Sequence, residues 1–428
     1  MSLYVPRRAV LGGGIAALAA IFGRSIAACS SDDGNNNATP AEDAGPEEDA
    51  STSVDAGDGE EFPYEPVTRP KIVSRIAAIG PLGAANADGI RLPPGFTGRI
   101  VAKSGTPTIP GKPHEWHSAP DGGACFPLAD GGFVYVSNSE VPLVGGVSAL
   151  RFDSAGNAVD AYRILDKTSV NCAGGPTPWD TWLSCEEVEK GRVHECDPKG
   201  KLPAIARPAL GVFKHEAAAV DPIQHRVYLT EDEPNGCFYR FVPDKLRKDG
   251  FANLSSGKLE VAVVGADGKV TWAEVPDPQY TGETPTRLQV ANATKFSGGE
   301  GIWWHAGIVY FTTKGTNEVW AYDTNTQTLT VLYDPTKSDG GAILSGVDNV
   351  TVSASGDVLV AEDGGDMQVV AILPSGEQKA LVQLEGYESS EITGPAFDPS
   401  GTRLYFSSQR GPKGGTTFEV TGPFHELA

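Results

Sequence analysis

Short runs of β-branched and aromatic residues recur along the chain beyond Pro63, and most of them end in acidic or amide side chains. Six of these runs are VYVSNSE (134–140), TWLSCEE (181–187), VYLTED (227–232), VYFTTKG (309–315), VLVAED (358–363) and LYFSSQ (404–409). Runs of this length and composition are typical of β-strands. Turn sequences such as DPIQHR, SASGD and DPSGT precede several of them, so each run is predicted to be the second strand of a hairpin.

The first strand of each predicted hairpin begins with a side chain that can bind a metal ion. These side chains are Cys125, Cys172, Glu216, Glu300, the pair Asp348 and Asn349, and Glu391. In an antiparallel hairpin the start of one strand lies beside the end of the next. Both sets of polar side chains are therefore expected at the same end of their hairpins.

The spacing of the hairpins predicts the fold. The units recur about every fifty residues, and a further strand follows most hairpins, as in ALRFDSAG, FYRFVPD and VWAYDTNT. Four-stranded units arranged radially form an all-β fold, a six-bladed β-propeller, which we predict for residues 69–428 with a metal site on its central axis. A β-sandwich or two stacked domains is the alternative. The many glycines (52) and prolines (32) agree with short strands and frequent turns.

Acidic side chains dominate the predicted meeting point of the hairpins. Crowded carboxylates repel one another, so either their pKa values rise or cations bind between them. Oxygen ligands suit calcium, whereas the thiolate of Cys172 suits a transition metal such as iron. The alternative is that each acid is an exposed turn residue. The expected ring consists of Glu187, Glu216, Asp232, Glu300, Glu362 and Glu391. His215, next to Glu216, is either an orienting group or a buried structural histidine.

The formal net charge of -21 narrows the class of partner. Such a charge argues against nucleic acid and against an anionic membrane surface, and it fits a protein that concentrates cations.

Two local features of the sequence predict further details of the structure. The segment 272–296 is too long for a hairpin turn and predicts an insertion with a short helix near residues 286–293. Cys196 and Cys237 could form a disulfide between successive blades.

The first 29 residues resemble an export signal and are excluded from the fold. Arg7 and Arg8 form a twin-arginine pair before a mildly apolar run, and residues 26–29 resemble a lipobox ending at Cys29. Residues 30–68 are predicted to be an acidic, disordered tether, because 32–61 hold eleven acids and no base. The chain is thus expected to be an exported lipoprotein, periplasmic or at the cell surface, anchored through Cys29. The alternatives are an ordinary secretion signal with an incidental cysteine, and an acidic cation-binding tail.

Several long motifs resemble those of the PhoX-type alkaline phosphatases, over most of residues 75–415. These are NCAGGPTPWDTWLSCEE (171–187), FKHEAAAVDPIQHRVYLTEDEPNGCFYRFVPD (213–244), Glu300 with Gly301, VDNVTVSASGDVLVAED (347–363) and EITGPAFDPSGTRLYFSSQ (391–409). The resemblance implies twin-arginine export, a six-bladed propeller and a mixed calcium and iron cluster on its axis. It also implies hydrolysis of phosphomonoesters outside the cytoplasm.

The resemblance assigns roles to individual residues. It implies that Cys172 binds iron and that Glu187 and Glu216 belong to the cluster. Together with Glu300 these two glutamates are the candidate catalytic residues. Further candidate metal ligands are Asp232, Glu300, Asn349, Asp363 and Glu391.

The chain departs from the family pattern at two places. Gly298 stands where the family usually has an arginine that helps to hold the phosphate, and Asn138-Ser139-Glu140 replaces Asn-His-Glu. Lys214, Lys314 and Arg410 are candidates to replace that arginine. The function expected is therefore a metal-dependent phosphatase acting on a small phosphate ester. A calcium-dependent lactonase or esterase and a non-catalytic, metal-stabilised binding propeller are the alternatives.

Overall fold

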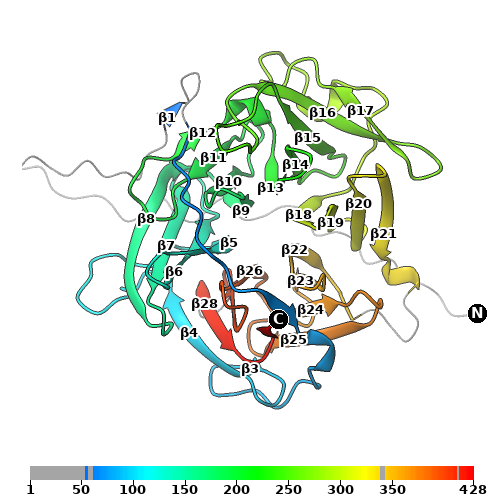
Figure 1. The fold of residues 1–428 in the computed structure, drawn as a ribbon. Helices are drawn as coiled ribbons and strands as arrows, with labels where there is room; N and C mark the ends of the chain where they lie inside the picture. The colour runs from blue at the N-terminus through cyan, green and yellow to red at the C-terminus, as the bar shows by residue number, and fades with distance from the viewer. Residues whose placement is uncertain (1–53, 56–60, 338–342, 412–413) are drawn as a thin grey trace, which may run out of the picture. The chain divides into compact units, whose positions relative to one another are not determined.

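The computed structural model describes residues 54–55, 61–337, 343–411 and 414–428. The predicted signal (1–29) and most of the predicted tether (30–68) lie outside these residues. Within them, six β-sheets are arranged around a central axis as the blades of a propeller (Figure 1). The predicted six-bladed propeller is confirmed, and the alternatives of a sandwich or of two stacked domains are wrong.

The first three blades follow the chain from residue 120. The first blade is β5 (Pro120–Pro127), β6 (Phe133–Ser139), β7 (Gly145–Phe152) and β8 (Ala158–Thr168). The second is β9 (Asn171–Pro176), β10 (Trp182–Glu186), β11 (Val193–Cys196) and β12 (Ile205–Ala206), with β1 (Val54–Asp55) parallel to β12. The third is β13 (His215–Asp221), β14 (Arg226–Glu231), β15 (Phe238–Pro243), β16 (Gly257–Val264) and β17 (Val270–Glu274).

The last three blades complete the ring. The fourth blade is β18 (Gly299–His305), β19 (Ile308–Thr313), β20 (Glu318–Asp323) and β21 (Thr328–Tyr333). The fifth is β22 (Val347–Val352), β23 (Val358–Glu362), β24 (Gln368–Ile372) and β25 (Gln378–Leu384), extended by β3 (Ile90–Arg91). The sixth is β26 (Ile392–Phe397), β27 (Arg403–Ser408) and β28 (Thr416–Thr421), and β4 (Thr97–Lys103) is its outer strand.

The first strand of each blade lies nearest the axis. These strands, β5, β9, β13, β18, β22 and β26, pack against one another in a closed cycle. The hairpin turns form as the sequence predicts. In DPIQHR, Asp221 Oδ1 accepts hydrogen bonds from the backbone N–H groups of Ile223 and Gln224, and His225 adopts a φ of 54°.

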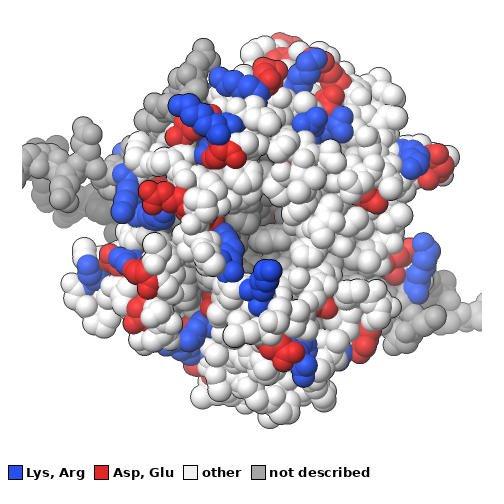
Figure 2. Space-filling model, in the orientation of Figure 1, with Lys and Arg blue, Asp and Glu red and all other residues white. Residues whose placement is uncertain are grey.

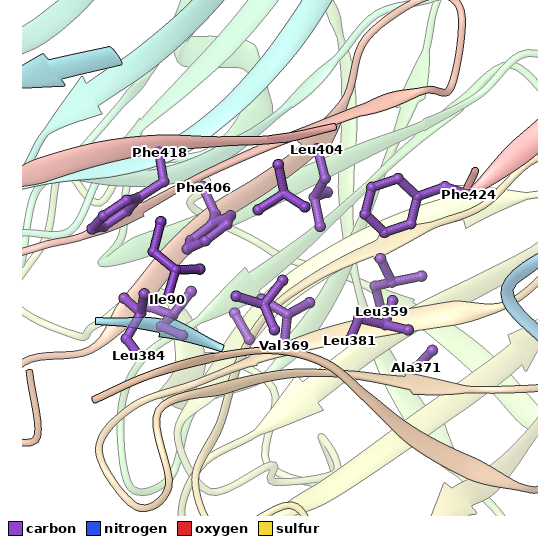
Figure 3. Close-up of a cluster of buried hydrophobic side chains, with 14 of the residues drawn as sticks. Ile90, Leu359, Val369, Ala371, Leu381, Leu384, Leu404, Phe406, Phe418 and Phe424 are labelled. Carbon is purple, nitrogen blue, oxygen red and sulfur yellow. The ribbon is translucent and has the colours of Figure 1, made fainter. Parts of the chain in front are cut away.

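Apolar side chains fill the space between neighbouring blades. Figure 3 shows the cluster between the fifth and sixth blades, where Leu359, Val369 and Leu381 face Phe406 and Phe418. All five side chains are fully buried. Burying a side chain of this size contributes about 1.5–3 kcal/mol, so blade-to-blade packing is the main source of stability.

The ends of the described chain tie the propeller together. Beyond β4, which closes the sixth blade, β2 (Ile72–Ser74) pairs with β29 (His425–Leu427). The segment before β2 also packs on the third blade, since Arg247 Nη2 donates to the carbonyl of Phe62 at 2.8 Å and the rings of Tyr64 and Phe251 are 5.8 Å apart. The packed part of the chain therefore begins before residue 69.

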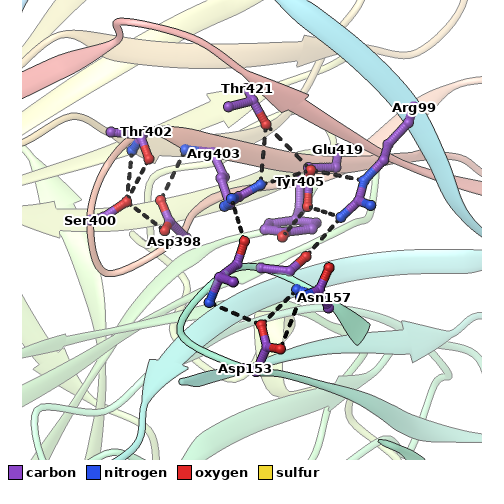
Figure 4. A network of polar contacts seen from close by, with 12 residues as sticks. Arg99, Asp153, Asn157, Asp398, Ser400, Thr402, Arg403, Tyr405, Glu419 and Thr421 are labelled. Carbon is purple, nitrogen blue, oxygen red and sulfur yellow. Dashed lines mark hydrogen bonds and ion pairs between the residues drawn. The ribbon is translucent and has the colours of Figure 1, made fainter. Parts of the chain in front are cut away.

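A polar network joins the closing strand to the sixth blade (Figure 4). Arg99 on β4 binds Glu419 with Nε to Oε1 at 2.9 Å and Nη2 to Oε2 at 3.0 Å. Arg403 Nη1 donates to Glu419 Oε1 at 3.0 Å, and Tyr405 donates its hydroxyl to Oε2. The Glu419 side chain is only 3% exposed, so the carboxylate depends on these partners.

Replacing Glu419 with alanine should destabilise the propeller. The change removes the carboxylate that accepts from the Tyr405 hydroxyl and from two guanidinium groups. The expected cost is about 2 kcal/mol, and it is limited to this value because Arg99 is half exposed and water can solvate it. Urea unfolding of the variant should show a lower midpoint. Glu274→Ala is the matched control: its ion pair with Lys258 is exposed on both sides, and its loss should change stability by less than about 1 kcal/mol. Equal midpoints for the two variants would contradict the prediction.

Two local predictions are wrong. The helix expected near residues 286–293 is only a 3-10 turn, η3 (Thr286–Leu288); the other 3-10 turns are η1 (Ile76–Ala78), η2 (Pro208–Leu210) and η4 (Pro335–Lys337). The Gln289 side chain instead bonds to the backbone of Asp277 and holds the segment as a loop. The five cysteines that the structure describes are all free thiols. Cys196 and Cys237 are buried in different hydrophobic clusters, so they do not pair.

The chain's acidic excess is not gathered on the face of the propeller drawn in Figure 2. Lys and Arg are interspersed with Asp and Glu there, and basic side chains lie beside a central hollow. Within the described part of the chain, no helix has the length and apolar character needed to span a membrane.

Candidate metal centre

Each inner hairpin carries a β-bulge close to the start of its first strand. The pairing register shifts between Pro120 and Gly123, Ser184 and Glu186, His215 and Ala218, Gly299 and Ile302, Val347 and Val350, and Thr393 and Ala396. A bulge changes the direction of a side chain. The bulged segments of the first five blades contain Asp121, Cys172, Glu216, Glu300 and Asp348.

Small residues follow these polar ones because the inner strands come very close together. A Cβ atom at Gly122 would lie 2.5 Å from the Cα of Ala173, and one at Gly301 would lie 2.5 Å from the backbone nitrogen of Val350. Larger side chains would push the neighbouring strand away. The close approach brings the polar side chains of adjacent blades within reach of one another.

The polar ends of the inner strands surround a cavity of about 300 Å³. Its lining includes seven acidic side chains, one thiol and two basic side chains. The residues are Glu140, Cys172, Glu187, Glu216, Glu300, Lys314, Val347, Asp348, Asp363, Glu391, Gln409 and Arg410. Each of the six blades contributes at least one acid, and the acid of the sixth blade is Glu391, directly before β26.

Two groups of side chains in this cavity can each hold a metal ion. The oxygens and sulfur of Glu140, Cys172 and Glu187 lie within 4.8 Å of one another, and so do the oxygens of a second group, Glu216, Glu300 and Asp348. Cys172 Sγ is 3.3 Å from Glu216 Oε1 and links the groups. Glu216 Oε2 is buried and has no hydrogen-bond partner. A buried, unpartnered carboxylate oxygen is costly unless a cation binds it.

Burial and mutual repulsion make these acids hard to ionise. Burial, together with neighbouring carboxylates, raises the pKa values of Glu216 and Asp348 well above the ordinary range. Burial raises the pKa of Glu187 and of Glu391 to about 7. The pKa of the Cys172 thiol is also raised well above its ordinary value, by burial and then by Asp121 and Glu216. A cation would stabilise the ionised forms of all these groups.

Three basic side chains neutralise part of the acidic charge. Lys314 Nζ lies 2.6 Å from Glu300 Oε1 and 2.8 Å from Asp232 Oδ2. Lys214 Nζ bridges Asp232 and Glu187, at 3.1 and 3.0 Å. Arg410 binds Glu140 and Glu391.

Comparison with known proteins identifies the family. A family model described as alkaline phosphatase PhoX matches residues 153–203 and 190–411, which is more than half of the chain. The chain belongs to the PhoX alkaline phosphatase family. No curated protein matches it in sequence.

The fold of this PhoX family member is similar to solved structures at low sequence identity. One is Pseudomonas fluorescens PhoX in complex with vanadate, a transition state analogue, with a TM-score of 0.66 and 18% identity over 82% of this chain and 98% of that chain. Another is a Bacteroides thetaiotaomicron protein of unknown function, with a TM-score of 0.50 and 9% identity over 79% of this chain and 84% of that chain.

In this PhoX family member, most of the predicted site residues meet in the cavity. Those that line it are Cys172, Glu187, Glu216, Glu300, Asp363 and Glu391. Asp232 lies directly behind them and is joined to Glu187 and Glu300 through the two lysines. Asn349 does not line this cavity: its amide donates to Asp348 Oδ1 at 2.8 Å and accepts from the N–H of Gly394. The neighbouring Asp348 therefore takes the position expected for Asn349.

Two other residues singled out from the sequence lie elsewhere. Glu362 accepts hydrogen bonds from the backbone N–H groups of Ser345 and Gln368, so it holds a loop and is not part of the ring. Cys125 packs in the hydrophobic cluster between the first and sixth blades. The prediction that Cys125 begins its strand is wrong. Asp121 stands near the start of that strand instead, and it is a buried acid that accepts a hydrogen bond from Gln409. His215 bonds to the Gly211 carbonyl at 3.0 Å and stacks on Phe213, which supports the structural alternative.

Three residues of this PhoX site were not among the predicted site residues. Asp121 could have been found, because like Cys172 and Glu300 it is followed at once by a small residue. Asn138 was noted only as the first residue of Asn138-Ser139-Glu140, and its role was not predicted. It donates to the carbonyls of Cys172 and Ala173 and accepts from Trp182 Nε1 and Ser184 Oγ, so it holds the Cys172 hairpin in place. Glu140 ends a predicted strand, but only the structure places it beside Cys172.

Proposed function

We propose that this chain is a metal-dependent phosphatase that hydrolyses phosphate esters in the acidic cavity. The observation that carries the proposal is the convergence of Cys172 and carboxylates from several blades on two metal-sized groups. The family supports phosphatase chemistry in general, and the structurally similar Pseudomonas fluorescens protein was solved with a transition state analogue, vanadate.

The charge of the cavity supports a role for cations. Seven acids face two bases in the lining, so a phosphate anion would be repelled from the protein alone. Metal ions bound there would neutralise phosphate oxygens and polarise the phosphorus centre. We propose calcium for the all-carboxylate group of Glu216, Glu300 and Asp348, and iron for the group that contains Cys172.

The protein's own residues would prepare the site. Asn138 holds the Cys172 hairpin through four hydrogen bonds, two to backbone carbonyls and two from the side chains of Trp182 and Ser184. The small residues behind the acids allow the inner strands to pack in close contact. In the metal-free protein burial raises the pKa of Glu187 to about 7, so part of this carboxyl is protonated near neutral pH, and a cation bound to its group would displace that proton. Rigid placement of this kind is what electrostatic stabilisation of a transition state requires.

An assay of the purified protein tests the proposal. After loading with calcium and iron, it should turn over phosphate esters in a panel that also contains lactones and carboxylic esters. Cys172→Ala and Glu187→Ala should each lower turnover by at least about 100-fold. Elemental analysis should find iron in the wild-type protein and much less in Cys172→Ala. Turnover of lactones alone would favour the lactonase alternative, and calcium without any turnover would favour a binding propeller.

We also propose export and lipidation, on the evidence of Arg7, Arg8 and Cys29 in the sequence. The mature protein would then act outside the cytoplasm while tethered to a membrane through the residues between Cys29 and the packed part of the chain. Mass spectrometry of the mature N-terminus is the test. A diacylated Cys29 is the expected result, and an unmodified chain beginning elsewhere would contradict it.

A further inference from the structure

Lys314 is, with Arg410, one of the two basic side chains that line the cavity. It follows β19 directly, and its ammonium group is held by Glu300 and Asp232 from two adjacent blades. The side chain is nevertheless 46% exposed, so its ammonium group can also reach a ligand inside the cavity. Lys214 differs in both respects: it does not line the cavity, and its side chain is 27% exposed.

Lys314 and Gly298 compete for the same space. The backbone N–H of Lys314 donates to the carbonyl of Gly298 at 2.8 Å, so the two residues lie side by side. A Cβ atom at Gly298 would be 2.7 Å from Lys314 Cγ and 3.4 Å from Cε. Gly298 also has a φ of +64°, a conformation that side-chain-bearing residues rarely adopt. A long side chain at position 298 and the present conformation of Lys314 exclude each other.

We propose that Lys314 binds the phosphoryl group of the substrate, with its side chain filling the place of the arginine expected at position 298. The inference rests on the proposed phosphatase function and adds to it the residue that recognises the anion. An ammonium group is a compact charge with three donors, which suits a phosphate oxygen.

Metal loading would free Lys314 for this role. In the structure its partners are two carboxylates, and both have a second source of positive charge. Asp232 Oδ2 is also bound by Lys214, and Glu300 belongs to a group that can hold a cation. A cation on Glu300 would weaken the attraction of that carboxylate for Lys314. The ammonium group could then turn to a phosphate oxygen without leaving either acid unpaired.

The test measures phosphate binding separately from catalysis. Inorganic phosphate is titrated into calcium- and iron-loaded wild type, Lys314→Met and Lys314→Arg by calorimetry, with metal content verified for each sample. Lys314→Met should bind phosphate about 10–100-fold more weakly and raise KM for a phosphate ester, because one charge-assisted hydrogen bond is lost. Lys314→Arg keeps the charge and should stay within about 3-fold of wild type. Lys258→Met, which removes an exposed ion pair on an outer strand, is the matched control and should bind phosphate as wild type does.

A double substitution tests the spatial argument. Gly298→Arg alone should lower the unfolding temperature, because its side chain meets the Lys314 stem. With Lys314→Ala the clash is removed, and the double variant should bind phosphate more tightly than Lys314→Ala alone. Independent effects of the two substitutions would contradict the shared space.

The inference is overturned if Lys314→Met binds phosphate as tightly as wild type at equal metal content. It is also overturned if Arg410→Met, and not Lys314→Met, weakens phosphate binding. A role of Lys314 only in holding the metals would lower metal content while leaving phosphate affinity at saturating metal unchanged. If the wild type binds phosphate through Lys314 but hydrolyses no ester, the proposed function fails while this inference stands.

Discussion

Replacing Glu216 with glutamine should abolish phosphatase activity and at the same time make the metal-free protein more stable. Glu216 is fully buried, and its Oε2 atom has no hydrogen-bond partner. Its pKa is raised by burial and by the carboxylates of Glu300, Glu187 and Asp348, so keeping this acid in the fold is costly. An amide of the same shape removes the ionisable group and should raise the free energy of unfolding by about 1–3 kcal/mol.

The same substitution removes a charged ligand from one of the two metal groups. Activity with metals present should therefore fall by at least about 100-fold, and calcium should no longer raise the unfolding temperature as much as in wild type. Opposite signs for stability and activity are typical of a residue kept for function at a cost to the fold.

Glu231→Gln is the matched control for the stability measurement. Glu231 is also fully buried, on β14 of the same blade, but its carboxylate accepts from Tyr239 and from the Cys237 N–H and pairs with Arg287. Burial also raises the pKa of Glu231, to about 7, but these hydrogen-bond and charge partners offset much of the cost. Losing them should destabilise the protein by about 1–3 kcal/mol. Urea unfolding in the presence of a chelator compares the two variants. A Glu216→Gln protein that unfolds more easily than wild type, or that keeps its activity, would contradict the prediction.

The repeated blades could be predicted because their signals are local. Alternating apolar residues, turn sequences and terminal acids all lie within one hairpin, and the same pattern occurs in unit after unit. Closure of the ring could not be predicted in this way. β4 pairs with β28 from the far end of the chain, and nothing in the sequence of residues 97–103 indicates that partner.

The candidate site was predicted in outline, and the β-bulges explain the error at Asn349. A bulge shifts the register by one residue, so it decides which of two neighbouring side chains enters the cavity. That is why Asp348 takes the place expected for Asn349. The error at Cys125 has another cause: β5 begins at Pro120, so Asp121 stands at the start of the strand and Cys125 lies in its interior. Supporting contacts such as those of Asn138 depend on two blades at once, and a single hairpin sequence does not contain them.

Calcium should stabilise the protein far more at pH 8 than at pH 5. The pKa values of Glu187 and Glu391 are about 7 in the folded metal-free protein, against an ordinary value of 4.5. Between these values the folded state retains protons that the unfolded state has released, so stability falls as pH rises through this range and levels off above about 7. For one such carboxyl the full loss is about 3 kcal/mol. Glu216, Glu300 and Asp348, whose pKa values are raised further, extend the fall to higher pH.

Calcium would reverse this loss because it binds the ionised carboxylates, and its stabilising effect should grow over the same range. Urea unfolding at pH 5, 6, 7 and 8, with calcium or with a chelator, measures the difference. Buried histidines have the opposite pH dependence: burial lowers the pKa of His215 to about 4, so that group favours the folded state as pH rises. It contributes equally with and without calcium, and the difference between the two conditions isolates the carboxylates. A double variant, Glu187→Gln with Glu391→Gln, should make the metal-free profile between pH 5 and 7 less steep. Part of the slope should remain, because burial also raises the pKa of Glu231 to about 7. A calcium effect that is constant over the range, or larger at pH 5, would show that the acidic cavity does not bind the cation.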